Sequence, residues 1–108
     1  MKRRKYQHPP KQLQGVLWSR DVNKLDMEKD KPYIIHQVLA YGSIDQWKWL
    51  IAQYSLDQIK NTFISNPYKD YRAPRYNLVT KYLLEIDNQT LNPARYVKNI
   101  PRDIRSSS

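Results

Sequence analysis

Hydrophobic residues recur at intervals of three and four from residue 33 to residue 64, which is the period of helices with one buried face. The alternation typical of β-strands is absent, and the apolar positions fall into three groups. We therefore expect three short helices joined end to end. The apolar positions are Ile34, Ile35, Val38, Leu39 and Tyr41, then Ile44, Trp47, Leu50, Ile51 and Tyr54, then Leu56, Ile59, Phe63 and Ile64.

Polar motifs mark the joints between these helices. Gly42 stands where a residue in the left-handed conformation would end the first helix. Ser43 with Gln46, and Ser55 with Gln58, have the spacing of a capping box, in which a hydroxyl caps the helix amides and the later side chain reaches back. Both breaks are thus predicted from local residues.

Prolines and aspartates set the outer limits of the helical stretch. Proline is tolerated in a first turn, so Pro32 favours a start at Lys31, with Asp26 and Asp30 as candidate N-caps. Pro67 cannot continue a helix, so the third helix is expected to end before it.

A fourth helix is predicted after Pro74, a residue suited to a first helical turn. Its expected buried face is formed by Leu78, Val79, Tyr82, Leu83 and Ile86. The fold class is therefore all-α, a small single-domain bundle of about four short helices. The domain is expected to span residues 16–87, between a disordered basic arm (1–15) and an irregular, extended tail (88–108).

Val16, Leu17 and Trp18 form a short apolar cluster ahead of the helices, expected to lie over them as extended chain. Trp18 is interpreted as a core plug in preference to a binding anchor. His36 is expected on a helix surface. Neither it nor His8 has a second ligand at metal-binding spacing, so no metal or cofactor is predicted.

The chain has 108 residues, no cysteine and a net charge of +9, which comes almost wholly from its two ends. A basic surplus at the ends suits either contact with phosphate or an acidic surface, or simple solubility. Without a glycine-rich phosphate loop, an activated-serine motif or an isolated carboxylate pair, we expect a protein that is not an enzyme. The absence of cysteine and of an N-terminal signal pattern favours a cytoplasmic location.

Two sets of residues are candidates for binding. The second and third helices could form a helix-turn-helix that reads DNA, exposing Asp57, Gln58, Lys60, Asn61 and Thr62, although a helical hairpin would show the same pattern. The candidate nucleic-acid contacts are Lys2, Arg3, Arg4, Lys5, Lys60, Asn61, Arg72 and Arg75, with a solvated face as the alternative for the last two. The candidate partner-binding residues of the tail are Leu91, Tyr96, Val97, Ile100 and Ile104, unless the tail wraps its own domain.

The stretch from Leu17 to Ile86 resembles a family of small uncharacterised bacterial proteins. The resemblance rests on an aromatic opening, Lys24-Leu25-Asp26, the pairs Ile34-Ile35, Val38-Leu39, Tyr41-Gly42 and Trp49-Leu50, then Ile59, and Tyr76-Asn77-Leu78 in the last helix. Members are commonly encoded beside a nucleotidyltransferase of the AbiEii toxin type and are regarded as its antitoxin. This chain departs from the family where an acidic Trp-Asp-x-Asp opening is replaced by Trp18-Ser19-Arg20-Asp21.

Two functions follow as expectations. The resemblance implies a non-catalytic antitoxin that binds and restrains a nucleotidyltransferase-type toxin. The basic residues suggest the alternative, a DNA-binding transcriptional regulator that could repress its own operon. The oligomeric state is left open.

Overall fold

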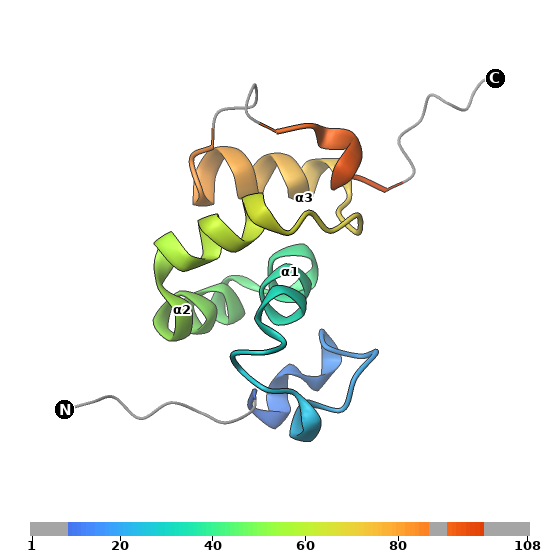
Figure 1. Ribbon diagram of the computed structural model, residues 1–108, viewed down its shortest axis with the longest axis vertical. Coiled ribbons are helices and arrows are strands. Elements are labelled where there is room, and N and C mark those ends of the chain that lie inside the picture. The colour runs from blue at the N-terminus through green and yellow to red at the C-terminus, as the bar shows by residue number, and fades with distance from the viewer. Residues whose placement is uncertain (1–8, 87–90, 99–108) are drawn as a thin grey trace. The chain divides into compact units, whose positions relative to one another are not determined.

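The computed structural model of the chain describes residues 9–86 and 91–98 (Figure 1). The chain forms two compact units, Met1–Phe63 (unit 1) and Ile64–Ser108 (unit 2). The described residues are mostly helical and include no strand, only one isolated bridge, so the all-α class is confirmed. The boundary between the two units, after Phe63, falls within residues 16–87, which were expected to form one helical domain.

Unit 1 begins with irregular chain that carries two 3-10 helices, η1 (Lys11–Gly15) and η2 (Val22–Lys24). They are followed by α1 (Lys31–Tyr41) and α2 (Ile44–Ser65), whose last two residues belong to unit 2. Leu13 in η1 is buried, so part of the segment expected to be disordered is folded. The starting point of α1 and the end of α2 before Pro67 agree with the predictions.

Helix α1 is buried along its length from Ile34 to Ala40. The prediction of a surface position for His36 is wrong, because this run leaves no solvent-facing side at that point. The imidazole is fully buried, and its ring centroid lies 5.4 Å from that of Phe63. A polar neighbour, Gln37, is buried as well and donates a hydrogen bond to the Val16 carbonyl at 2.7 Å.

The joint between α1 and α2 requires glycine for a reason other than the predicted one. Gly42 has φ −79° and ψ 164°, which is extended backbone, so the left-handed prediction is wrong. A Cβ at this position would lie 2.5 Å from the Val38 carbonyl oxygen, which leaves no room for a side chain. The capping box is confirmed: the Gln46 amide donates to Ser43 Oγ at 3.2 Å, and the Ser43 amide donates to Gln46 Oε1 at 2.8 Å.

Helix α2 breaks at Ser55, where φ is 71° and ψ is 154° (Figure 1). Ser55 Oγ accepts from the Gln58 amide at 3.3 Å, which caps the second half of α2 as its spacing predicted. Three residues assigned to buried faces are instead exposed: Ile44, Leu56 and Ile64.

Unit 2 contains α3 (Ala73–Asn77), a π-helix that continues it, η3 (Leu78–Leu83), and a 3-10 helix, η5 (Pro93–Arg95). The prediction of a regular helix with Leu78 and Tyr82 in the core is wrong, since these are 40% and 76% exposed. Hydrogen bonds to the fifth preceding residue widen the turn and change which side chains face inward. Val79 and Leu84 occupy the core.

Three tyrosines form the centre of unit 2. The ring centroid of Tyr71 lies 6.4 Å from those of Tyr76 and Tyr96, and the latter two are 5.5 Å apart. A parallel bridge joins Tyr71 to Val97, with the Tyr71 amide donating to the Tyr96 carbonyl at 2.9 Å. The segment expected to be a free tail therefore packs, over residues 91–98, against its own unit.

Candidate interaction surface

Gln14 holds the irregular start of unit 1 in one conformation. Its amide nitrogen donates to the carbonyls of Leu17 at 2.9 Å and Arg20 at 2.7 Å, and its oxygen accepts from the Val22 amide at 3.0 Å. One side chain thus satisfies three backbone groups of a loop that lacks regular hydrogen bonding.

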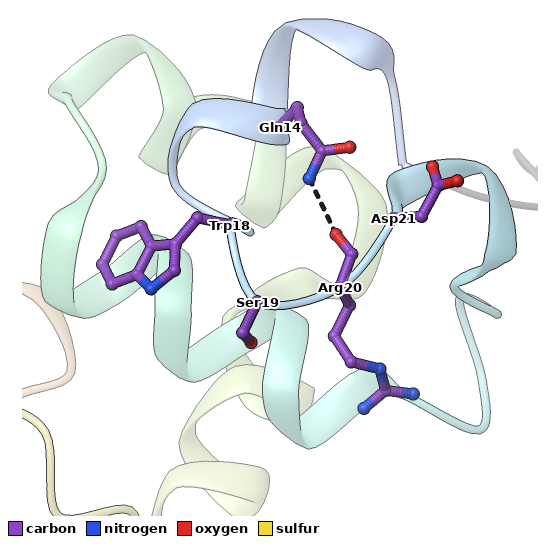
Figure 2. Close-up of a pocket in the computed structure, with 5 residues that line it drawn as sticks. All are labelled: Gln14, Trp18, Ser19, Arg20 and Asp21. Carbon is purple, nitrogen blue, oxygen red and sulfur yellow. Dashed lines mark hydrogen bonds between the residues drawn. The ribbon is translucent and has the colours of Figure 1, made fainter.

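This loop encloses an open pocket of about 390 Å³, which Figure 2 shows with its lining side chains. The lining residues are Gln14, Trp18, Ser19, Arg20 and Asp21. The pocket combines an aromatic wall with polar and charged groups of both signs. That composition suits recognition of a mixed polar and apolar surface.

Trp18 is 55% exposed, so the prediction that it plugs the core is wrong. Leu17, which is fully buried, fills the core instead, and the next side chain in the sequence, that of Trp18, points outward. The Trp18 ring meets the half-buried Tyr41 ring edge-on, with centroids 4.6 Å apart and planes at 66°. Ile44, 60% exposed, lies three residues beyond Tyr41, across the tight joint at Gly42. We call Trp18 and Tyr41 the aromatic patch.

Arg20 is held in place beside this patch. Its guanidinium lies 5.5 Å from the centre of the Tyr33 ring and 3.0 Å from Asp30 Oδ1. The Tyr33 hydroxyl also lies 2.7 Å from Ser19 Oγ. An exposed ion pair of this kind contributes little stability, so its main effect is to orient the guanidinium.

Asp26 and Asp30 organise the turn that leads into α1. Asp26 accepts hydrogen bonds from the Lys29 and Glu28 amides, which lower the pKa of its carboxyl group. Asp30 makes no side-chain cap to α1 and instead accepts from the Asp26 amide at 2.8 Å. Of the two candidate N-caps, Asp30 thus lacks the predicted bond.

Tyr54 fastens the same turn to α2. Its hydroxyl donates to the Met27 carbonyl at 2.7 Å, and burial raises the pKa of this phenol. Trp47 makes a similar bond, from Nε1 to the Val38 carbonyl at 3.0 Å. The core of unit 1 is therefore fixed by side chains that donate to backbone carbonyls.

The tail candidates for partner binding are distributed differently from the prediction. Tyr96 and Val97 are buried, so they face the core of unit 2 and are not available for docking. Leu91 is half-buried, and Ile100 and Ile104 lie outside the described residues. Over residues 91–98, Tyr96 and Val97 thus pack on their own unit, which is the arrangement described by the second of the two alternatives.

The candidate nucleic-acid contacts do not form one cluster within either unit. Lys60 and Asn61 lie at the surface of α2 in unit 1, whereas Arg72 and Arg75 belong to unit 2. Thr62, expected to be exposed with Lys60, is buried. The basic residues Lys2, Arg3, Arg4 and Lys5 lie outside the described residues.

Within residues 9–86 and 91–98, no group of three His, Cys, Asp or Glu side chains could hold a metal ion. In the same ranges, no helix is long and apolar enough to cross a membrane.

The model of one family, described as "Family of unknown function (DUF6922)", matches residues 13–63. This similarity includes the Gln14 loop and the aromatic patch, and it ends where unit 1 ends. No curated protein and no solved structure matches the chain.

Sequence reasoning missed Gln14 and the exposure of Trp18. The signal available for Trp18 was its position between buried Leu17 and the polar run from Ser19 to Asp21. No comparable signal existed for Gln14, because its partners are backbone groups.

Proposed function

We propose that this chain is a non-catalytic, antitoxin-like protein that binds and restrains a nucleotidyltransferase-type toxin. The enzyme class comes from the resemblance described above. The observation that supports a binding role is Trp18, a large side chain that is more than half exposed yet held by an edge contact to Tyr41.

Exposed tryptophan beside polar groups is a common feature of binding hot spots. Because Gln14 fixes the loop that carries Trp18, little conformational entropy is lost when a partner covers the ring. The burial of Tyr96 and Val97 moves the proposed interface from the tail to unit 1. In this mechanism, unit 1 covers the nucleotide or acceptor site of the toxin, and the chemistry belongs to the partner.

The test mixes the purified chain with an AbiEii-type nucleotidyltransferase from the same host. We expect a complex by size-exclusion chromatography and loss of nucleotide transfer. Trp18→Ala should weaken the complex roughly 30-fold or more, as for a central aromatic anchor. Tyr82→Ala, which removes an exposed aromatic ring of unit 2, is the matched control and should bind normally.

The absence of a complex between the wild-type proteins would contradict the proposed function. Equal weakening by both substitutions would instead contradict the assignment of the interface to the aromatic patch.

A further inference from the structure

The bridge between Tyr71 and Val97 brings together basic residues that are distant in sequence. Arg72 follows Tyr71, and Arg95 precedes Tyr96, whose carbonyl accepts from the Tyr71 amide. Consecutive Cα atoms are about 3.8 Å apart, and Tyr71 and Tyr96 are joined by a backbone hydrogen bond. The Cα atoms of Arg72 and Arg95 therefore lie within roughly 13 Å of each other. Lys69, which is exposed, lies two residues before Tyr71 in the chain.

Unit 2 carries more basic than acidic side chains. The described basic residues are Lys69, Arg72, Arg75, Lys81, Arg95 and Lys98, against Asp70 and Glu85. Lys98 pairs with Asp70 at 3.2 Å, which neutralises one charge of each sign. Lys69, Arg72, Lys81 and Arg95 are exposed, and none forms an ion pair with an acid among the described residues.

An exposed aromatic ring, that of Tyr82, lies near the end of η3, the π-helix that continues α3. Tyr82 is 76% exposed and follows Lys81, and Leu78 is also exposed one wide turn earlier. The π-helix produces this arrangement, since a regular helix was expected to bury both apolar residues. Lys81 lies nine residues after Arg72, within the π-helix that continues α3.

We infer that the exposed basic residues and the exposed Tyr82 ring of unit 2 bind single-stranded nucleic acid. Lys69, Arg72 and Arg95 would contact backbone phosphates, and a base would stack on the Tyr82 ring beside Lys81. A basic track combined with an exposed aromatic platform is how proteins bind unpaired strands without base readout. The buried tyrosine cluster fixes the backbone beside Arg72 and Arg95, because Tyr71 and Tyr96 are the residues next to them. This inference does not depend on the toxin-binding proposal.

The test measures fluorescence anisotropy of a labelled 16-nucleotide strand, as DNA and as RNA, over a range of salt concentrations. The background chain carries Lys2→Gln, Arg3→Gln, Arg4→Gln and Lys5→Gln, so that the basic N-terminal residues do not mask unit 2. Added to it, Arg72→Gln with Arg95→Gln should lower the slope of log affinity against log salt by about 1.4, because each lost phosphate contact of a single strand contributes about 0.7.

Lys24→Gln with Lys48→Gln removes the same charge from exposed positions of unit 1 and is the matched control. It should leave the slope near that of the background chain. Tyr82→Leu should weaken binding roughly 5- to 150-fold, the range given by base–aromatic stacking, whereas Tyr82→Phe should retain it.

Three results would each overturn the inference. One is that the double substitution in unit 1 and the double substitution in unit 2 give the same slope of log affinity against log salt. Another is a duplex of the same sequence that binds as tightly as the single strand. The third is displacement of the strand by polyglutamate at the same charge concentration, which would identify an acidic protein surface as the ligand.

Discussion

The two units stabilise irregular chain in different ways. In unit 1, polar side chains donate to backbone carbonyls, as Gln37 does to Val16 and Tyr54 to Met27. In unit 2, a backbone bridge and the edge-on and tilted contacts among the rings of Tyr71, Tyr76 and Tyr96 hold residues 91–98 in place. Loss of a contact therefore has different consequences. In unit 1 it leaves a buried carbonyl without a donor, and in unit 2 it leaves a cavity.

The largest effect is expected for Tyr96→Ala. The ring is almost fully buried against Tyr71 and Tyr76, so its removal should destabilise unit 2 by about 3–5 kcal/mol. Hydrogen exchange should accelerate in α3 and remain slow in α1. Tyr82→Ala, at an exposed position, is the control and should change the hydrogen exchange of neither α3 nor α1. Equal acceleration in both units would contradict the distinction between them.

Gly42→Ala should be the most damaging small change in unit 1. The new Cβ would lie 2.5 Å from the Val38 carbonyl oxygen, a backbone atom within α1 that cannot move easily. We expect a loss of about 3 kcal/mol in the free energy of unfolding, measured by urea denaturation. Gly15→Ala meets nothing within 4 Å and should be neutral or slightly stabilising. Similar midpoints for both variants would be inconsistent with this account.

Gln37→Met tests the polar fastening of unit 1. Methionine fills a similar volume but leaves the Val16 carbonyl without its donor, at a cost of about 2 kcal/mol. Hydrogen exchange should increase in the Pro9–Asp30 segment. Exposed Gln12→Met is the control, and an equal response to it would rule out the bond as the cause.

Alkaline pH should unfold unit 2 before unit 1. Burial raises the pKa of three tyrosines in unit 2, Tyr71, Tyr76 and Tyr96, and that of Tyr54 in unit 1. In the unfolded chain these phenols ionise near pH 10, whereas in the folded chain, where their pKa is raised, they stay protonated. Rising pH therefore favours the unfolded chain, and stability that is fully present below pH 10 is lost above it. Hydrogen exchange that accelerates first in α1 would contradict the prediction.

Ser55→Gly should have the smallest effect and the opposite sign. Ser55 has φ 71° and ψ 154°, a region that disfavours side chains, and glycine relieves this strain while losing only a weak cap. We expect the free energy of unfolding to rise by about 1 kcal/mol for Ser55→Gly and to fall for Ser55→Ala, both measured by thermal denaturation. In unit 2, Glu85, with φ 53°, offers the parallel change Glu85→Gly. Destabilisation by glycine at both positions would show that neither is strained.

The features of α1 and α2 that depend on neighbouring residues could be predicted from the sequence. The start at Lys31, the Ser43–Gln46 box and the end of α2 each depend on contacts within four residues. The conformation of Gly42 could not be predicted, because its cause is a close approach to Val38 in the folded helix.

The parts of the chain set by distant contacts were predicted poorly. The periodicity after Pro74 is that of a regular helix, and nothing local indicates the π-helix that exposes Leu78 and Tyr82. The bridge from Tyr71 to Val97 joins segments 26 positions apart, and it buries Tyr96 and Val97, for which both docking and packing on the same domain were open from the sequence. Trp18 and Leu17 are adjacent and both apolar, so apart from the polar run that follows Trp18 nothing local distinguishes the exposed side chain from the buried one.

The most direct test of the proposed function is a titration of the nitrogen-15-labelled chain with the nucleotidyltransferase, observed at the three tryptophan indole N–H signals. Trp18 is exposed on the aromatic patch, whereas Trp47 Nε1 is bonded to Val38 and Trp49 Nε1 is buried. The account predicts that the Trp18 signal shifts or broadens first, in proportion to the complex formed. A complex that leaves the Trp18 signal unchanged would contradict it.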